Sequence, residues 1–367
     1  MRVPFGDLKR EYLSRRDEYD AAVRRVMESG WFVLGSEGEA FEQEFAAWVG
    51  APYCVACNSG TDAIHLALIA GGLFEGERVV TAANTCVPTV AAIGAAHGSI
   101  GLCDVLQDCA LMDPGALDEE LTARPARAVV PVHLYGQAAD LEGIYAVAEK
   151  HGAFVVEDAA QGHGARYDGK RIGSHGGTVA WSFYPSKNLG AFGDGGAVTT
   201  HSAELANRLR MLRNYGQEKR YYHSIPGINS RLDEVQAAIL RLRLPHLKTA
   251  NGRRRHIAQR YRAEIRNEAI RFIGVAARSV GCEHLFPVVC EERDRLQELL
   301  EERGVNCLIH YPVPIHLQKA YCGLGYERGT IPNAERFAST ELSFPMYPEL
   351  TDAEVDYVIE SVNSVRL

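Results

Sequence analysis

Short apolar runs rich in β-forming residues alternate with helix-capable segments across the first two hundred residues of the chain. The runs expected to form strands are Tyr53 to Cys57, Arg78 to Ala83, Ile100 to Val105, Ala128 to Tyr135, Phe154 to Gln161, Thr178 to Tyr184 and Gly196 to Thr200. Helix-capable segments such as Thr61 to Ala70, Pro88 to His97 and Asp140 to His151 lie between the first five. Such alternation is typical of βαβ units, so we predict an α/β fold with a mainly parallel seven-stranded sheet flanked by helices.

Two details refine this sheet. The segment from Ser186 to Gly196, between the sixth and seventh runs, is too rich in glycine for a crossover helix. The seventh strand is therefore expected to be antiparallel to its neighbour. Before the first strand, apolar residues at helical spacing around Tyr19 and around Phe45 predict two helices.

After Thr200 the alternation of strands and helices gives way to long, arginine-rich segments with helical periodicity. Helices are expected over Ala203 to Arg213, Leu232 to Leu244 and from Pro245 to Ile265, then a strand over Phe286 to Cys290, a helix over Glu292 to Arg303 and a strand over Val305 to Tyr311. A proline inside helical text marks a kink, so we place a boundary there. We predict a large domain over residues 1–245 and a smaller α+β domain over residues 246–367.

Composition excludes several classes of protein. The 367 residues carry 39 Lys plus Arg against 47 Asp plus Glu, a net charge of -8 that argues against a nucleic-acid or anionic-membrane binder. Hydrophobic residues make up 46% and charged residues 23%, as in an ordinary globular protein. No secretion signal or membrane span is visible, which predicts a soluble, cytoplasmic protein with reduced cysteines. Cys54 and Cys57 have no second pair to complete a metal site, and we expect them to be buried.

Polar residues interrupt three strand ends, where ligands bind in open parallel sheets. Ser59, Gly60 and Thr61 begin an apolar helix whose amides suit a phosphate, although such residues also simply cap helices. Asp158 ends a buried strand and can face a positively charged ring nitrogen, or pair with a lysine. Lys187 follows an apolar strand, where partial burial makes an amine nucleophilic; otherwise it is a surface lysine. Together these three parts are what pyridoxal 5'-phosphate requires of a protein.

The sequence also resembles the aminotransferases that act on nucleotide-linked keto-sugars, the DegT/DnrJ/EryC1/StrS type within the fold type I pyridoxal phosphate enzymes. The similar segments are Ser59 to Ala63, Glu157 to Gln161, Ser182 to Gly190, Gly193 to Ala197, Asn214 to Gly216 and Asn229 to Ala238. The resemblance runs from the N-terminal helices to the end of the chain. It implies an aspartate aminotransferase-like large lobe.

The resemblance implies roles for individual residues. Lys187 would form the Schiff base with the cofactor, Asp158 would contact the pyridine nitrogen, and Gln161 would lie near the ring hydroxyl. Gly60, Thr61 and Ser182 would hold the phosphate. Asn229 would reach the phosphate of a neighbouring subunit, which implies a homodimer with shared active sites. Cys86 stands where many relatives place an aromatic residue that stacks on the cofactor ring.

The resemblance also implies the reaction. Glutamate would donate the amino group through a pyridoxamine phosphate intermediate, and a keto-sugar nucleotide would receive it. Lys-Asn-Leu-Gly followed by Gly-Asp-Gly-Gly is typical of members that aminate the 3-position, which favours a 3-keto-6-deoxyhexose on dTDP over a 4-keto sugar. A histidine replaces the lysine in related sugar dehydratases, so Lys187 favours amino transfer. The residues expected near the sugar nucleotide are Tyr184, Tyr215, His310, Tyr311 and His316.

Other interpretations have weaker support. A pyridoxal phosphate-binding regulator would keep the same site, but no basic DNA-binding extension is present. A redox protein would depend on Cys54 and Cys57. The segment Gly164 to Arg171 has the spacing of a nucleoside-triphosphate loop but lacks its Ser or Thr, so a hairpin turn at Asp168-Gly169 is expected instead. The run Arg253 to Arg255 is expected to be a solvated helix face.

Overall fold

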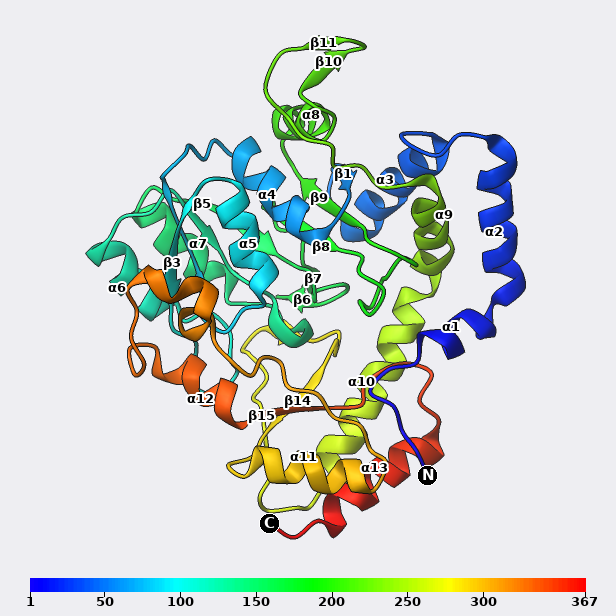
Figure 1. Ribbon diagram of the computed structural model, residues 1–367, viewed down its shortest axis with the longest axis vertical. Helices are drawn as coiled ribbons and strands as arrows, with labels where there is room; N and C mark the ends of the chain where they lie inside the picture. Colours follow the sequence, from blue (N-terminus) through cyan, green and yellow to red (C-terminus); the bar gives the residue numbers. More distant parts are fainter.

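A computed structural model describes all residues, 1–367, and contains the predicted sheet (Figure 1). Its strands are β1 (Tyr53–Cys57), β2 (Arg78–Ala82), β3 (Ser99–Cys103), β4 (Ala128–Val130), β5 (Phe154–Asp158), β8 (Thr178–Ser182) and β9 (Gly196–Thr200). Their order is β1-β9-β8-β5-β4-β2-β3. Only β9 runs antiparallel to its neighbours, β1 and β8. The prediction of a mainly parallel seven-stranded sheet with an antiparallel last strand is confirmed.

Helices cover both faces of this sheet. One face packs against α4 (Gly60–Ala70), α5 (Val87–Ala95) and α8 (Ala203–Leu212). The other packs against α3 (Ser36–Val49), α6 (Pro114–Ala123), α7 (Leu141–Lys150) and α9 (Glu234–Arg243). Side-chain caps fix several helix starts, as where Asp140 accepts from the amide of Gly143. Each helix that follows a parallel strand therefore begins at the edge of the sheet where that strand ends.

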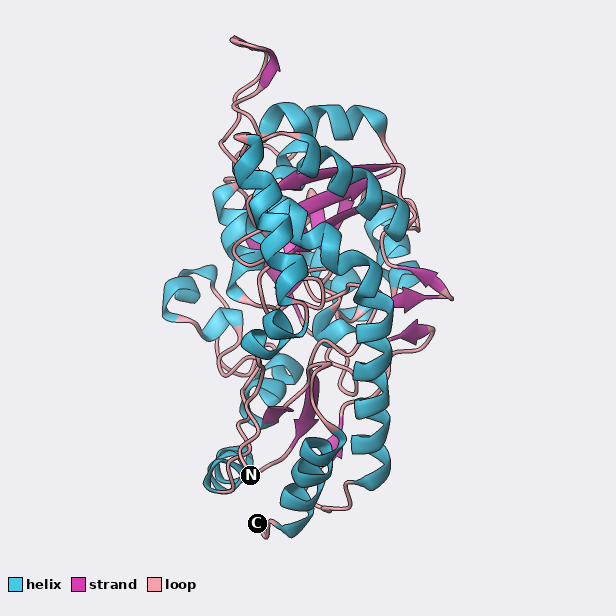
Figure 2. Ribbon diagram, turned by 90° about the vertical axis from the view of Figure 1, so that its right-hand side faces the viewer, coloured by secondary structure: helices cyan, strands magenta, loops and turns pink.

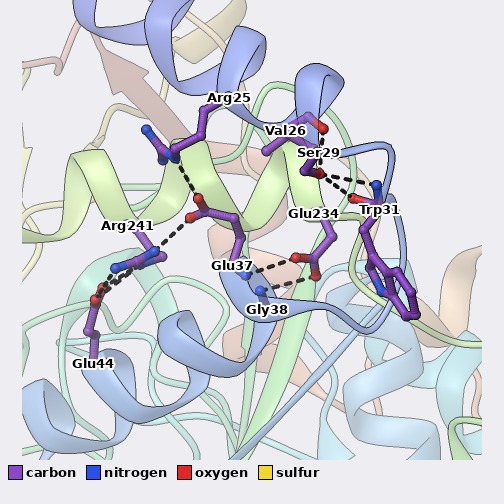
Figure 3. Close-up of polar contacts among 9 residues, drawn as sticks. All are labelled: Arg25, Val26, Ser29, Trp31, Glu37, Gly38, Glu44, Glu234 and Arg241. Carbon is purple, nitrogen blue, oxygen red and sulfur yellow. Dashed lines mark hydrogen bonds and ion pairs between the residues drawn. The ribbon is translucent and has the colours of Figure 1, made fainter.

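Three helices, not two, precede β1: α1 (Leu8–Ser14), α2 (Arg16–Ser29) and α3. Helix α1 has no buried residue, so its sequence lacks the apolar stripe that reveals a helix. An ionic network joins α2, α3 and α9 (Figure 3), because Glu37 accepts from Arg25 and Arg241 at 2.7 Å each. The carboxylate of Glu234, at the start of α9, also accepts from the first amides of α3. These contacts fix the start of α9 and the loop before it.

The C-terminal third forms an antiparallel sheet with its own core. Its strands are β12 (Arg271–Phe272), β14 (Phe286–Val289) and β15 (Glu341–Phe344), and its helices are α10 (Leu247–Glu264), α11 (Arg293–Glu302), α12 (Pro332–Thr340) and α13 (Asp352–Ser364). The predicted strand over Val305 to Tyr311 is wrong, since these residues make only isolated bridges. One such bridge joins Val305 to Val3, so the chain start packs into this C-terminal core, and both termini lie at the same end of the molecule (Figure 1).

The short elements complete the fold. They are β6 (Arg166–Tyr167), β7 (Lys170–Arg171), β10 (Gln217–Lys219), β11 (Tyr222–His223), β13 (Ser279–Val280), η1 (Leu134–Gly136), η2 (Leu244–His246), η3 (Ile315–Leu317) and η4 (Lys319–Leu324). Strands β6 and β7 confirm the hairpin at Asp168-Gly169, where both residues have positive φ. Strands β10 and β11 form a hairpin that projects from the body (Figure 2). No helix is long and apolar enough to span a membrane.

Pro245 lies in η2, the short 3-10 segment that joins α9 to α10. Helix α10 continues from it into the C-terminal core, where Ile257 and Tyr261 are buried. The α-helical hydrogen-bond pattern is therefore interrupted at this proline. The division into domains at residues 245 and 246 stays a prediction, and the packing of Val3 with the C-terminal core adds the chain start to the second unit.

Candidate active site

A cavity of about 900 Å³ opens beside the carboxyl ends of the central strands. It is lined by residues of the large sheet, by the N-terminal segment from Phe5 to Arg15 and by residues of the C-terminal third. Most of the predicted site residues meet here: Gly60, Thr61, Cys86, Asp158, Gln161, Ser182, Tyr184, Lys187, His310 and Tyr311. Residues far apart in the sequence therefore share one enclosure large enough for a cofactor and a substrate.

The start of α4 forms an anion cradle at one end of the cavity. Ser59 accepts from the amides of Asp62 and Ala63, which leaves the amides of Gly60 and Thr61 without an intrahelical partner. The positive end of the helix dipole adds to their attraction for an anion. A Cβ on Gly60 would lie 2.5 Å from Cβ of Ser182, so only glycine lets Ser182 approach the helix start. The cradle therefore fits a phosphate group.

Asp158 lies at the end of β5 with its carboxylate in the cavity. The side chain is 4% exposed, and it accepts from Thr89 Oγ1 at 2.9 Å and from the amide of Ala160 at 3.0 Å. Burial raises its pKa, while these hydrogen bonds and the charge of Lys187 oppose that rise. A carboxylate held this way gains most from a cationic partner, such as a protonated pyridine nitrogen.

Lys187 follows β8 and lines the same cavity. Burial lowers the pKa of its ammonium group, and the nearby Asp158 and Cys86 oppose this effect. Burial disfavours the charged form of an amine, which leaves a larger neutral fraction that can act as a nucleophile or a base. Lys187 pairs with no carboxylate at ion-pair distance, so its amine remains available for chemistry. The alternative of a solvated surface lysine is excluded.

Gln161 lines the cavity and forms hydrogen bonds with Tyr135 and Tyr311. Its Oε1 accepts from the amide of Tyr135 at 2.6 Å, and its Nε2 donates to the hydroxyl of Tyr311 at 3.2 Å. These two bonds fix the orientation of the amide beside the cavity. Cys86 precedes α5 and lines the cavity as well, and burial raises the pKa of its thiol. Cys86 therefore presents a thiol in its neutral form to the cavity.

Three predicted residues lie outside the cavity of their own chain. Asn229 is exposed and bridges only to Asn214. Tyr215 is 48% exposed and stacks under Arg231. His316 is 2% exposed, and its Nε2 lies 3.1 Å from Glu335. None of the three residues lines the cavity of its own chain.

Sequence reasoning missed several residues of the cavity. Thr89 holds the Asp158 carboxylate and lies one turn after Cys86. Its position one helical turn after Cys86 was the sequence signal that could have identified it. Arg254 was expected on a solvated face, but it is 6% exposed and lines the cavity, because the segments that carry His284 and Met346 pack against it. Only Arg253 and Arg255, its neighbours, retain access to solvent.

The remaining candidates do not form sites. Cys54 and Cys57 are 2% and 0% exposed, and burial raises the pKa of both thiols, so the prediction of buried small residues is confirmed. Glu157, next to Asp158, points to the other face of the strand, where it contacts His133 at 2.9 Å and Tyr145 at 2.8 Å. No group of three or more His, Cys, Asp and Glu side chains is arranged to hold a metal ion.

Comparisons with known proteins agree with this geometry. The model of the DegT/DnrJ/EryC1/StrS aminotransferase family matches residues 14–363. The dTDP-3-amino-3,4,6-trideoxy-alpha-D-glucose transaminase of Streptomyces venezuelae is 46% identical over 364 residues, 98% of this chain and 95% of that protein. The dTDP-3-amino-3,6-dideoxy-alpha-D-galactopyranose transaminase of Aneurinibacillus thermoaerophilus is 43% identical over 361 residues, covering 98% and 99%.

A solved structure is similar over its whole length. The crystal structure of S. venezuelae DesV in complex with a ketimine intermediate superposes with a TM-score of 0.96 at 45% identity, covering 99% of this chain and 98% of that one. The similarity includes both sheets, so it extends to the whole enclosure around Lys187 and Asp158. The chain therefore belongs to the DegT/DnrJ/EryC1/StrS aminotransferase family and is an aminotransferase.

Proposed function

We propose that this enzyme transfers the amino group of glutamate to the keto carbon of a dTDP-linked 3-keto-6-deoxyhexose. The observation that carries the proposal is the placement of Lys187, Asp158 and the Gly60–Thr61 cradle in one cavity. Two relatives named for 3-amino sugar nucleotides, at 46% and 43% identity, support the sugar class and the 3-position. The 4-keto sugar aminotransferases and the sugar dehydratases are the alternatives that the experiment below separates.

Pyridoxal phosphate is the cofactor, and the residues present fit it. When bound, it supplies an electron sink for the bond electrons released at Cα of the amino acid. The amides of Gly60 and Thr61 would hold its phosphate, together with the Ser182 hydroxyl. Asp158 would keep its ring nitrogen protonated, and Lys187 would hold its aldehyde carbon.

Lys187 performs the proton transfers in both halves of the reaction. Because burial favours its neutral amine, Nζ accepts the proton from Cα of the amino donor. In the second half, the same amine returns a proton to C3 of the sugar. Thr89 and the amide of Ala160 hold the Asp158 carboxylate in place through both halves.

Arg254 gives the cavity a cation for an anionic substrate. Its Nη1 donates to the carbonyl oxygens of Met346 at 2.6 Å and His284 at 3.3 Å, and no carboxylate forms an ion pair with it. Its Nε is buried without a partner, and burial lowers its pKa to about 10. A buried guanidinium without an acidic partner favours an anion. The sugar diphosphate and the donor carboxylates both have the required charge.

Product analysis tests the proposed reaction. The holoenzyme is incubated with glutamate and a panel of 3-keto and 4-keto nucleotide sugars, and products are identified by mass spectrometry and NMR. We expect a 3-amino sugar nucleotide and equimolar 2-oxoglutarate. Amination at C4 would show that the enzyme is a 4-keto sugar aminotransferase and would contradict the proposed 3-position. A deoxygenated sugar without 2-oxoglutarate would contradict amino transfer altogether.

The enzyme is further proposed to act as a homodimer with shared sites. Asn229 lies outside its own cavity, although the family resemblance assigns it to a cofactor phosphate. Ser230, beside it, donates to Asp62 at 2.7 Å, and Glu234 accepts from the first amides of α3 (Figure 3). These contacts hold the loop at both ends, with Asn229 exposed. The surface nearby is apolar, with Trp31 63% and Phe32 46% exposed. These features suit contact with a second copy of the chain.

Mixing two defective variants tests the shared site. Lys187→Ala removes the amine, and Asn229→Asp places a negative charge against the phosphate of the neighbouring site. Each variant alone is expected to be nearly inactive. After unfolding and refolding together, about a quarter of wild-type activity should return, because half of randomly formed dimers are hybrids and each has one intact site. No recovery in a mixture that light scattering shows to be dimeric would contradict shared sites.

A further inference from the structure

A chain of hydrogen bonds leads from the cavity to a carboxyl group that no solvent reaches. His310 lines the cavity, and its Nδ1 lies 3.0 Å from the hydroxyl of Ser343. That hydroxyl lies 2.5 Å from Oε1 of Glu341. The other carboxyl oxygen, Oε2, accepts from the backbone amide of His310 at 2.6 Å. Glu341 and Ser343 are both 0% exposed, so the chain is closed at its inner end.

The imidazole of His310 is held so that its opposite edge faces the substrate. Its ring stacks on Phe5 with centroids 5.5 Å apart, and its carbonyl oxygen accepts from the hydroxyl of Tyr135 at 2.6 Å. Nδ1 is occupied by Ser343, while Nε2 has no partner within the chain and is not among the buried atoms. Burial and the charge of Lys187 lower the pKa of the imidazole to about 4, so the ring is neutral and carries one proton.

The two ends of this hydrogen-bond relay, His310 and Glu341, are coupled because each bond in it needs one donor and one acceptor. With Glu341 ionised, Ser343 donates to the carboxylate and accepts from Nδ1–H, and Nε2 presents a lone pair. With Glu341 protonated on Oε1, the carboxyl donates to Ser343, Ser343 donates to Nδ1, and Nε2 presents an N–H. Converting the ionised form into the protonated one takes up one proton at Nε2 from the cavity, shifts one proton along each bond of the relay and leaves no charge on His310.

We propose that Ser343 and Glu341 are positioning residues that set, through this relay, whether His310 donates a hydrogen bond to the sugar substrate or accepts one from it. The proposal rests on the function above for the identity of the substrate, but the relay itself is independent of it. A sugar hydroxyl can pair with either form, whereas a keto oxygen pairs only with Nε2–H. The proton on Glu341 would thus decide which substrate oxygen His310 contacts.

The surroundings of Glu341 place its protonation in an accessible range. Burial raises its pKa to about 8, and hydrogen bonds from Ser343 and the His310 amide oppose the rise. The other charged or titratable groups near it are Arg293 from α11, Cys307 from the segment after α11, and Tyr135 from η1. Arg293 donates to the backbone carbonyl of Glu341 and not to its carboxylate, so no cation neutralises the carboxylate directly.

Nitrogen NMR of the holoenzyme tests the relay directly. Histidine labelled with ¹⁵N distinguishes Nδ1–H from Nε2–H, and the His310→Asn variant identifies the signal. We expect the wild-type signal to change from the Nε2–H to the Nδ1–H form as pH rises from about 6 to about 9. In Glu341→Gln the amide always donates to Ser343, so Nε2–H should persist throughout. A single wild-type tautomer, or a Glu341→Gln variant that titrates like wild type, would overturn the relay.

Kinetics separate positioning from structure. Loss of one neutral hydrogen bond should raise KM for the sugar nucleotide about 3- to 10-fold. That increase is expected in wild type above the transition, with KM for the amino donor unchanged, whereas Ser343→Ala, which cuts the link to Glu341, should show no such change of KM between about pH 6 and about pH 9. Glu341→Gln should keep the low KM across the range. Equal increases in both KM values would show a structural role and contradict the proposal, while inactivity toward all keto-sugars with an intact NMR transition would refute only the proposed function.

Discussion

Replacing Lys187 by alanine should lower amino transfer more than about 10³-fold, because the same amine links the cofactor and moves the proton. Burial disfavours the charge of this lysine, so its removal is not expected to destabilise the fold. Steady-state product formation measures the loss. The thermal unfolding midpoint and the circular dichroism spectrum check the fold.

Lys170→Ala is the matched control for this change. Lys170 is exposed in the β6–β7 hairpin and forms no ion pair, so its loss removes one positive charge without touching the cavity. Activity of this variant should remain within about twofold of wild type. A folded Lys187→Ala enzyme with substantial turnover would remove the lysine from its assigned role.

Replacing Asp158 by asparagine should lower kcat about 10²- to 10³-fold, as expected when one preorganised charge is lost from a site. The amide keeps an oxygen for the hydrogen bond from Thr89 or from the amide of Ala160, and so the side chain should stay in place. It lacks the negative charge that would keep the ring nitrogen protonated. Rapid-mixing measurements of the glutamate half-reaction report this step alone.

A surface aspartate provides the control for charge. Asp118 pairs with Lys150 and His151 on the exposed side of the molecule, and Asp118→Asn should leave kcat unchanged. The Asp158 charge also raises the pKa of Lys187, so Asp158→Asn should shift the pH profile of the lysine downward. Near-normal kcat in Asp158→Asn would show that the carboxylate does not face the reacting group.

The sheet was predictable because each strand is a short run of apolar residues that can be seen in the sequence alone. Runs such as Tyr53–Cys57 and Gly196–Thr200 are buried over nearly their whole length. A short run of apolar residues is a direct sign of such burial. Helix α1 escaped because it buries nothing. The segment after Val305 is strand-like in composition but pairs only at single positions, Val305 with Val3 and Leu308 with Ser343. Pairing partners, unlike burial, are not written in local sequence.

The centre of the site was predictable for a different reason. Gly60, Asp158 and Lys187 each interrupt a strand end with a residue that core packing does not require, so their presence pointed to chemistry. Arg254 was misjudged because a helix face cannot show, by itself, that segments distant in the sequence cover it, here those of His284 and Met346. Glu341 and Ser343 were invisible for the same reason. They matter only through contacts with His310, over thirty residues away.

Chemical trapping tests the central claim most directly. The holoenzyme is reduced with borohydride, digested, and its peptides are analysed by mass spectrometry. A pyridoxyl group on Lys187, and its absence when glutamate is added before reduction, is the predicted result. Modification of another lysine, or a protein that binds the cofactor with Lys187 unmodified, would contradict the assignment of this cavity as the site of amino transfer.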